Sequence, residues 1–277
     1  MNFKREKRKS RKKKYYVLGI VFCLSFLFFY LLQTSIAHRN GYFQPEYPRV
    51  TLNEESDYST LFLQTGLGKA AVDKLLEKGD FQTILNVQNA FFSKDTVTCI
   101  PVIGWFTKSD RVSKQDSAPL VDLQPGDILL SLSTHSLGWN HGHAGLVLNE
   151  TSVLECTSWG KNSEIKGVEH WRNYSNYVVL RVQGVTKEMQ NGVVSFAKEN
   201  MCDVPYRLTA GFFGEKALST ENQAFGLQCA YLVWYAWQEF GYDLDSDGGR
   251  LVTMQDILES QQLEIVQIYG INPLEFY

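Results

Sequence analysis

The sequence has little cysteine, little proline and a modest share of charge for its length. Five cysteines in 277 residues are too few for a small disulfide-stapled scaffold, and seven prolines with 21 glycines exclude a collagen-like or low-complexity chain. Charged residues make up 21% and hydrophobic residues 44%, which excludes wholesale disorder and a multi-span membrane protein. The length fits one good-sized domain with additional segments, or two small domains.

The small net charge conceals an uneven distribution of charged residues. Residues 4–14 hold nine of the 27 basic residues and one of the 30 acidic residues. The rest of the chain therefore has 18 basic and 29 acidic residues, a formal charge of −11. An acidic body of this kind argues against nucleic acid as a partner.

An uncharged apolar run of 18 residues follows the basic cluster, over residues 15–32. As a helix it would be about 27 Å long, close to the ~30 Å hydrocarbon core of a bilayer. With the basic residues on the cytoplasmic side, it predicts a single-pass membrane anchor over residues 15–37, with the body outside the cell. The alternative is a signal peptide cleaved after Ala37, which has small residues at the −3 and −1 positions and would make the body a secreted protein.

Changes in composition divide the chain into five segments. We expect a cytoplasmic basic segment at 1–14, the anchor or signal at 15–37, a linker at 38–57, a helical lead with a polar linker at 58–119, and the main domain at 120–277. In the lead, apolar residues recur at helical spacing in two stretches. Gly79 and Asp80 separate these stretches as a helix stop followed by an N-cap, so two short helices are predicted.

The main domain begins with short apolar runs that are typical of strands and continues with amphipathic helices. The predicted strands cover residues 127–133, 143–148, 153–157, 177–182 and 263–269. Helices are predicted over 186–200 and over 228–240, the second largely buried and ended by Gly241. Strands with helices to one side predict an α+β fold with an antiparallel sheet.

Cys229 is the strongest candidate for a nucleophile. It lies at the predicted start of the buried helix, where unpaired backbone N–H groups and the helix dipole favour a thiolate. The same N–H groups would stabilise a developing oxyanion. The alternative is a structural cysteine, because free cysteine is among the most buried residue types.

His143 and Glu155 are the candidates for a base and its orienting acid. His143 begins an apolar strand and Glu155 lies 12 residues later, across a predicted hairpin turn. If the hairpin places Glu155 opposite Gly145, then Glu155 and His143 share one face of the sheet on the diagonal. The carboxylate would then orient the imidazole. The alternative for the histidine is a satisfied core residue.

Four short motifs, in this order, resemble the permuted branch of the NlpC/P60 superfamily. They are Leu123-Gln-Pro-Gly-Asp-Ile-Leu-Leu, His143-Ala-Gly-Leu-Val, Val153-Leu-Glu and Cys229-Ala-Tyr-Leu-Val. The resemblance is to the YiiX/YaeF-like permuted papain-fold hydrolases and, more distantly, to lecithin:retinol acyltransferase, and it covers about residues 120–262. It implies a permuted papain-like domain in which Cys229 is the nucleophile, His143 the base and Glu155 the polar residue that orients it.

The function that this resemblance implies is a membrane-anchored cysteine hydrolase, an amidase or peptidase that forms a thioester and needs no cofactor or metal. Its expected substrate is a cell-wall peptide. One alternative keeps the centre but acts on a lipid ester or acyl chain; the other is an inactive surface-binding module. Ala230 departs from the family, which often has a small hydroxyl residue after the cysteine, and leaves substrate preference open.

Two further residues are weaker candidates for the same site. Gln223 lies six residues before Cys229, a spacing similar to that of the papain oxyanion glutamine. Tyr206, in a Val-Pro-Tyr motif ahead of the nucleophile helix, resembles a family position near the site and is otherwise a core aromatic.

Other clusters give weak signals for a metal or a disulfide. Asp243, Asp245 and Asp247 match the start of a calcium loop, but position 12 of that loop is Met254, where a bidentate glutamate is expected. The spacing of His135, His141 and His143 matches no usual zinc motif. The sequence leaves open whether Cys99, Cys156 and Cys202 form a disulfide.

Overall fold

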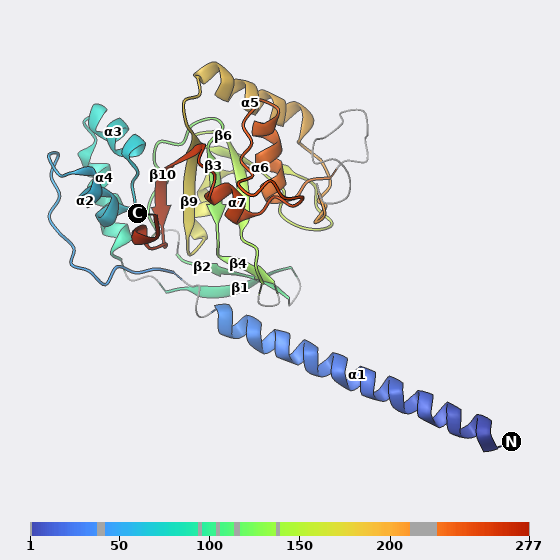
Figure 1. The fold of residues 1–277 in the computed structure, drawn as a ribbon. Helices are drawn as coiled ribbons and strands as arrows, with labels where there is room; N and C mark the ends of the chain where they lie inside the picture. The colour runs from blue at the N-terminus through green and yellow to red at the C-terminus, as the bar shows by residue number, and fades with distance from the viewer. Residues whose placement is uncertain are drawn as a thin grey trace.

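The structure, a computed structural model, is α+β with antiparallel sheets, as the strand and helix patterns predicted (Figure 1). It describes residues 2–37, 42–93, 96–103, 106–113, 117–136, 139–210 and 226–276. In the first helix, side chains are described for residues 13–29 and 31.

A six-stranded antiparallel sheet forms the centre of the molecule. In order across it, the strands are β10 (Leu263–Tyr269), β9 (Tyr177–Val182), β3 (Ile128–Ser131), β6 (His143–Asn149), β7 (Ser152–Glu155) and β8 (Glu164–Gly167). The predictions for β10 and β9 are confirmed to the residue, and those for β3, β6 and β7 to within two residues at each end. The short β8 has no strand predicted for it, because two of its four residues, Glu164 and Lys166, are charged.

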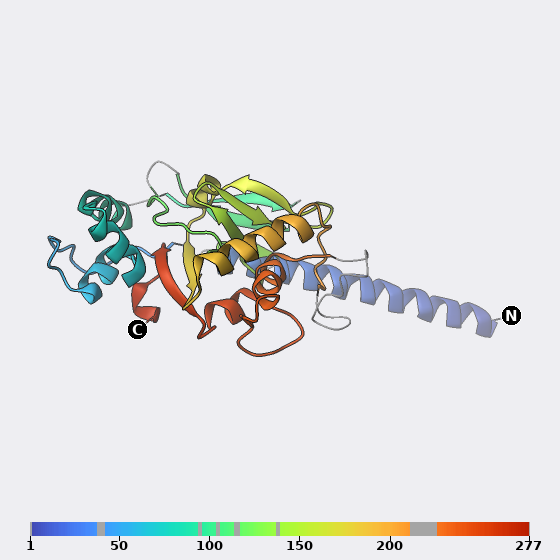
Figure 2. The same cartoon turned by 90° about the horizontal axis from the view of Figure 1, so that it is seen from above.

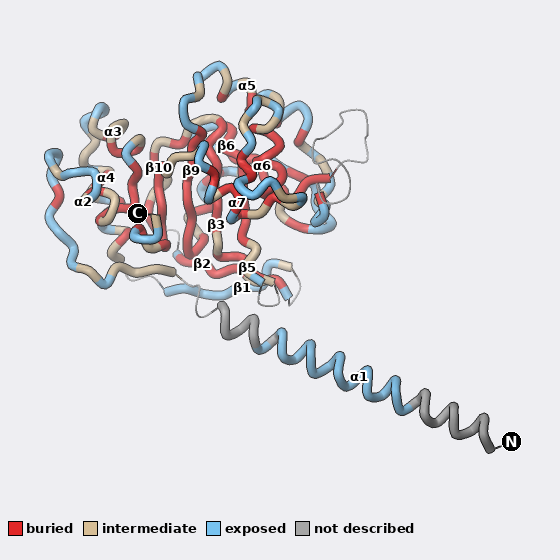
Figure 3. Tube along the Cα trace, viewed as in Figure 1, coloured by how far each residue is buried: buried red, intermediate tan, exposed pale blue. Residues whose placement is uncertain are grey.

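Alternate residues of the central strands enter two different cores, because successive side chains of a strand point to opposite faces. Ile128 and Leu130 join one cluster and Leu129 the other; Val178 and Val179 divide in the same way. Both faces of the sheet are therefore covered, which explains why its strands read as nearly continuous apolar runs. Figure 3 shows the buried residues running through the sheet and into α6.

The helices that follow β9 cover one of these faces (Figures 1 and 2). They are α5 (Lys187–Asn200), α6 (Cys229–Gln238) and α7 (Met254–Leu258). The side chain of Thr186 caps α5 by accepting a hydrogen bond from the Met189 N–H. Nine of the ten residues of α6 are buried, and its four aromatic rings pack in the core, as the sequence predicted for this helix.

Three short helices, where the sequence predicted two, contribute to the second core. They are α2 (Tyr58–Thr65), α3 (Lys69–Glu77) and α4 (Phe81–Phe91). The break between α2 and α3 has a tertiary cause: Leu67 forms an isolated bridge with Gln267 of β10, and Gly66 adopts a φ of 71° against that strand. The predicted break at Gly79 is confirmed, and Asp80 caps α4 through the Thr83 N–H.

A second, four-stranded sheet lies beside the central one (Figure 1). Its strands are β1 (Thr98–Ile103), β2 (Thr107–Arg111), β4 (Thr134–Ser136) and β5 (Trp139–Asn140), in that order. Strand β2 occupies part of a stretch that its polar composition indicated as a linker. The sheet is joined to the rest at Arg111, which pairs with Tyr174 in an isolated bridge. The remaining elements are two 3₁₀ helices, η1 (Val168–Asn173) and η2 (Pro273–Phe276).

Helix α1 (Asn2–Ala37) contains the run from which the sequence predicted a membrane anchor. Among the described residues, no helix is long and apolar enough to cross a membrane. The predicted transmembrane helix, the membrane partner and the single-pass location derived from it are therefore wrong.

Candidate active site

Strands β6 and β7 bring His143 and Glu155 together. Glu155 pairs with Gly145, which is the register on which the sequence made this contact conditional. His143 then lies diagonally across from Glu155 on the same face, and its Nε2 is 3.2 Å from the Glu155 Oε1 atom. Both side chains are buried.

Gly145 has no side chain, and the space this leaves is occupied by Glu155 and Trp171. A Cβ atom at Gly145 would lie 3.3 Å from the Glu155 Cγ atom and 3.2 Å from a ring carbon of Trp171, both tighter than ordinary contact. It would also lie 2.6 Å from a methyl group of Val153. A side chain at this position would therefore displace the acid or the tryptophan, so the glycine serves the site by its small size.

Glu155 has two further polar neighbours that the sequence gave no reason to place here. His170, in η1, approaches the same Oε1 atom with its Nε2 at 3.1 Å, and Lys166, on β8, has its Nζ 3.4 Å from Oε2. Lys166 reaches the site because β8 extends the sheet beyond β7 and pairs Glu155 with Glu164. The completely buried glutamate is therefore accompanied by two imidazoles and one ammonium group, which offset the cost of burying its charge.

Two aromatic rings pack against the imidazole of His143. The Trp171 ring stacks on it, with a centroid distance of 5.3 Å and an interplanar angle of 13°. The Tyr174 ring lies 6.2 Å away, and the Arg111 guanidinium lies 3.7 Å from the centre of that tyrosine. Trp171 and Tyr174 lie at either end of a polar stretch with no periodicity, so the sequence indicated neither. The stacking fixes the plane of the ring.

Cys229 is the first residue of α6, and its thiol interacts with the imidazole of His143. It is 9% exposed. Gln228 caps the helix by accepting a hydrogen bond from the Ala230 N–H at 3.0 Å, and the Cys229 Sγ atom lies 3.7 Å from the same amide oxygen. The Gln228 Nε2 donates to the Val252 carbonyl at 2.7 Å, which fixes the cap in place. The three predicted residues thus meet at the start of α6.

The pKa values of the acid and the base move in opposite directions. Burial would lower the pKa of His143, but Tyr174, the Glu155 carboxylate and the Cys229 thiol outweigh it and raise that pKa well above its usual value. Burial would raise the pKa of Glu155, but the neighbouring His143 and His170 hold it well below its usual range. The pair is therefore an imidazolium and a carboxylate at neutral pH.

Tyr206 lies beside the thiol, whereas the position of Gln223 falls outside the described residues. Burial raises the pKa of Tyr206, and the thiols of Cys229 and Cys156 contribute to the increase. The backbone of Tyr206 forms a bridge with Leu227, two residues before the nucleophile candidate. This places the tyrosine at the predicted site without giving it a chemical role.

The Gly126-Asp127 motif serves structure rather than chemistry. Asp127 is fully buried and accepts two hydrogen bonds of 2.8 Å from the guanidinium of Arg181 on β9. Gly126 adopts a φ of 85°, and its carbonyl accepts the Trp237 indole N–H at 3.0 Å. The motif therefore ties the start of β3 to β9 and α6.

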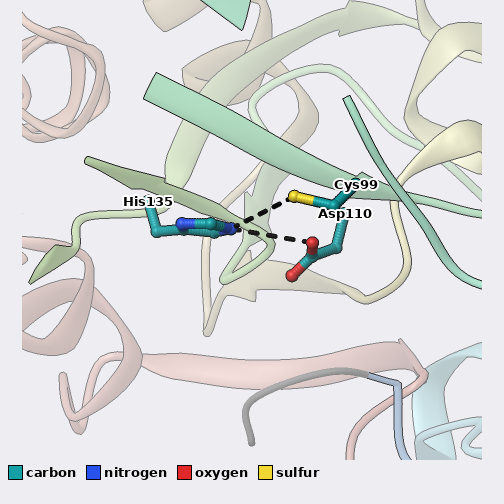
Figure 4. A group of neighbouring side chains, drawn as sticks. All are labelled: Cys99, Asp110 and His135. Carbon is teal, nitrogen blue, oxygen red and sulfur yellow. Dashed lines mark hydrogen bonds and ion pairs between the residues drawn. The ribbon is translucent and has the colours of Figure 1, made fainter. Parts of the chain in front are cut away.

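The three histidines of the candidate zinc cluster, His135, His141 and His143, have different partners. His141 hydrogen-bonds the Ser136 hydroxyl at 2.9 Å, and His143 belongs to the site above. His135 instead joins Cys99 and Asp110 in the four-stranded sheet (Figure 4). None of the five cysteines forms a disulfide.

The acidic turn after α6 is held by local hydrogen bonds. Asp243 accepts the Trp234 indole N–H at 2.7 Å and the backbone N–H of Asp245 at 3.2 Å, and Asp247 accepts the Gly249 N–H at 2.6 Å. Oxygens of Asp245, Asp247 and Asp256, rather than Asp243, lie within 4.8 Å of one another. The grouping that the sequence suggested for calcium is therefore not the one that the turn brings together.

Comparison with known proteins gives one weak structural similarity. No family model and no curated protein matches the sequence. Among solved structures, the chain is similar to the crystal structure of the metalloprotein yiiX from Escherichia coli O157:H7, DUF1105, at 18% sequence identity. The similarity covers 52% of this chain and 96% of that one, with a TM-score of 0.39. Membership of the permuted NlpC/P60 branch, the assignment of 120–277 as its domain and the catalytic roles therefore stay predictions.

Proposed function

We propose that this protein is a cysteine hydrolase that cleaves an amide bond through a thioester intermediate. The observation that carries the proposal is the contact of one buried imidazole, that of His143, with both the Cys229 thiol and the Glu155 carboxylate. Acyl transfer of this kind requires a nucleophile in contact with a base, and an acid in contact with that base that orients it.

The proposed chemistry begins at Cys229. In the resting site the thiol proton already resides on His143, and the thiolate sulfur attacks the carbonyl carbon of the substrate to form a tetrahedral intermediate. That intermediate collapses as the C–N bond breaks, and His143 returns the proton to the leaving amine. His143, now neutral, takes a proton from water as the water oxygen attacks the thioester. The second intermediate collapses as the C–S bond breaks, which releases the acid and restores the thiolate beside the imidazolium.

The other residues of the site support these steps. Glu155 accepts from Nε2 of His143 and stabilises the imidazolium. The start of α6 offers the backbone N–H of Cys229 and the positive end of the helix dipole to the oxyanion. The Ala230 N–H is held by Gln228, so it is not part of this proposal.

The proposal names the class of bond that is cleaved, an amide, but not the substrate that contains it. The cell-wall peptide that the sequence suggested depended on placing the body outside a membrane, and that placement is corrected above. An acyl ester meets the same centre with the same chemistry, and amine release against fatty-acid release distinguishes the two. An inactive binding module would keep the fold without the reactive thiol.

The test is the reactivity of the thiol in the full chain. Limiting iodoacetamide is applied between pH 5 and 9, and the labelled cysteines are mapped by mass spectrometry. Cys229 should be alkylated before Cys99 and Cys202, although both of these are more exposed, and should lose that lead in His143→Ala. Equal labelling of the three cysteines, or a Cys229 rate unchanged in His143→Ala, would overturn the proposal.

A matched control separates base catalysis from loss of structure. His141→Ala removes a histidine two residues from His143 that hydrogen-bonds Ser136 rather than the thiol. It should leave the rate at Cys229 unchanged. If both histidine variants slow the labelling equally, the effect of His143→Ala comes from the local fold and not from the imidazole.

A further inference from the structure

A second cluster of cysteine, histidine and acid lies in the four-stranded sheet, apart from the residues of the proposed hydrolase centre. It consists of Cys99 on β1, Asp110 on β2 and His135 on β4 (Figure 4). One ligand atom from each residue lies within 4.8 Å of the other two.

The strand register explains why these three side chains meet. Cys99 pairs directly with Asp110, and His135 pairs directly with Lys108, two residues before Asp110 on β2. Residues two apart on a strand share a face, and directly paired residues do too. The three side chains therefore project from one face of the sheet, with Asp110 between the cysteine and the histidine strands.

The three groups converge on one ring nitrogen, which distinguishes a ligand set from a proton relay. The Cys99 Sγ atom is 3.9 Å and the Asp110 Oδ1 atom 3.6 Å from the same atom, Nε2 of His135. A catalytic dyad with an orienting acid uses opposite nitrogens of the ring, because one holds the nucleophile and the other the acid. Here Nδ1 is buried and has no hydrogen-bond partner among the described residues, so no acid orients the ring from behind.

The distances suit a tetrahedral ion with a small inward adjustment. Zinc lies about 2.3 Å from thiolate sulfur and about 2.0 Å from imidazole nitrogen or carboxylate oxygen. At tetrahedral angles these bonds separate sulfur from nitrogen by about 3.6 Å and nitrogen from oxygen by about 3.3 Å. The observed separations exceed these values by about three tenths of an ångström each.

Burial and charge also favour a cation. Asp110 is 4% exposed and His135 3%, and the side-chain partners of Asp110 among the described residues are His135 and Cys99. Acids are rarely buried in this way without a counter-charge. A divalent ion bound by one thiolate, one carboxylate and a neutral imidazole makes a site with no net charge. Cys99 is exposed, so an ion can enter from its side.

We propose that Cys99, Asp110 and His135 bind one zinc ion, with the fourth coordination position open to water. Sulfur and nitrogen ligands select a borderline-soft transition metal over calcium or magnesium. The site would cross-link three strands of the small sheet. It would also steady the neighbourhood of the proposed centre, because the residue after Asp110, Arg111, packs on Tyr174 next to His143. The proposal does not depend on hydrolase activity.

The test is a cobalt titration of the full chain after treatment with a chelator. Cobalt substitutes for zinc, and a cobalt–thiolate bond gives a charge-transfer band in the near ultraviolet with visible bands typical of tetrahedral geometry. We expect saturation at one ion per chain and displacement of the cobalt by an equivalent of zinc. Absence of a thiolate band at stoichiometric cobalt would overturn the proposal.

Three variants locate the ion. Cys99→Ser, at an exposed position, should abolish the thiolate band and weaken binding by roughly 100-fold or more. Asp110→Asn, which keeps the shape of the buried side chain, should weaken binding while the band is retained. Cys202→Ser, the matched control at another part-exposed free thiol, should change neither. A band that survives Cys99→Ser and disappears in Cys229→Ala would place the metal at the other centre and overturn the proposal.

Discussion

The molecule contains two clusters of cysteine, histidine and acid, and they differ in how the acid and the thiol meet the imidazole. At His143, the acid takes one nitrogen and the ring also contacts the thiol, with donors gathered around the acid. At His135, acid and thiol approach the same nitrogen and the other is left without a partner among the described residues. The same three residue types therefore suit proton transfer in one place and ion binding in the other.

The difference follows from the strands and helices that carry the three residues of each cluster. Cys99, Asp110 and His135 come from three neighbouring strands of one sheet, so their side chains leave one face side by side. Cys229 comes from the start of a helix, while His143 and Glu155 come from paired strands. A helix that meets a sheet can approach the far side of a ring, which neighbouring strands of the same sheet do not do.

The largest expected effect is the difference in turnover between variants of the two thiols, Cys229 and Cys99. Cys229→Ala should lower turnover of an amide or thioester substrate by about 10³-fold or more, because the nucleophile is lost. Cys99→Ser should lower turnover far less than Cys229→Ala, since that thiol belongs to the other cluster. Steady-state kinetics on matched preparations measure both. A reversed order of the two effects would exchange the roles assigned to the clusters.

Removing the charge of the orienting acid should have a smaller effect. Glu155→Gln keeps the size of the side chain but loses the carboxylate that holds Nε2 of His143, and kcat should fall by about 10²- to 10⁴-fold with KM little changed. Lys166→Met, which removes a donor on the other oxygen of Glu155, is the matched control and should cost much less. A comparable loss in both variants would indicate a collapsed acid pocket.

Zinc should stabilise the chain through the small sheet. At an ion concentration of 100 times the dissociation constant, linkage adds about 2.7 kcal/mol, which corresponds to several degrees in the unfolding temperature of a protein of this size. The increase should be absent in Cys99→Ser and retained in Cys229→Ala. Thermal unfolding with zinc and with excess chelator measures it. An equal increase in all three proteins would indicate binding elsewhere.

The smallest effect is a pH dependence of stability. The contribution of Glu155, whose pKa is lowered by folding, is present above its unfolded value of about 4.3 and is lost as pH falls below it. The contribution of His143, whose pKa is raised, is present below about 6.5 and is lost as pH rises through the folded value. The pair therefore stabilises the fold most between about pH 4.5 and 6.5.

Urea denaturation of the wild type and of Glu155→Gln measures this profile. The stability difference between them should decline once pH exceeds the folded pKa of His143 in the variant, by about 1.4 kcal/mol for each unit by which Glu155 raises that pKa. A difference that stays constant from pH 5 to 9 would mean that Glu155 does not raise the pKa of His143.

Most of the secondary structure of the main domain was predictable, because its signals are local. The short apolar runs of β9 and β10 and the amphipathic pattern of α5 each lie within a few consecutive residues. The strands of the small sheet were missed because polar residues such as those of β2 form a strand only when neighbours supply hydrogen bonds and cover one face. The anchor was wrongly predicted from apolarity alone.

The candidate site was predictable in part for the same reason. Cys229 at a helix start and His143 with Glu155 across a hairpin follow from local patterns, and only the register had to be learned from the structure. His170, Lys166 and Trp171 could not be placed, because they reach the site through an added strand and a 3₁₀ helix. Their positions depend on long-range pairing.

By itself, the sequence determined the α+β composition, the antiparallel central strands and the residue types able to act as nucleophile, base and acid. The tertiary structure decided which of those residues meet. It joined His143 to Glu155 and Cys229 and sent His135 to Cys99 and Asp110, although the two histidines lie eight positions apart. The physical reason is that local patterns fix which face a side chain occupies, whereas strand order and helix placement fix what lies opposite that face.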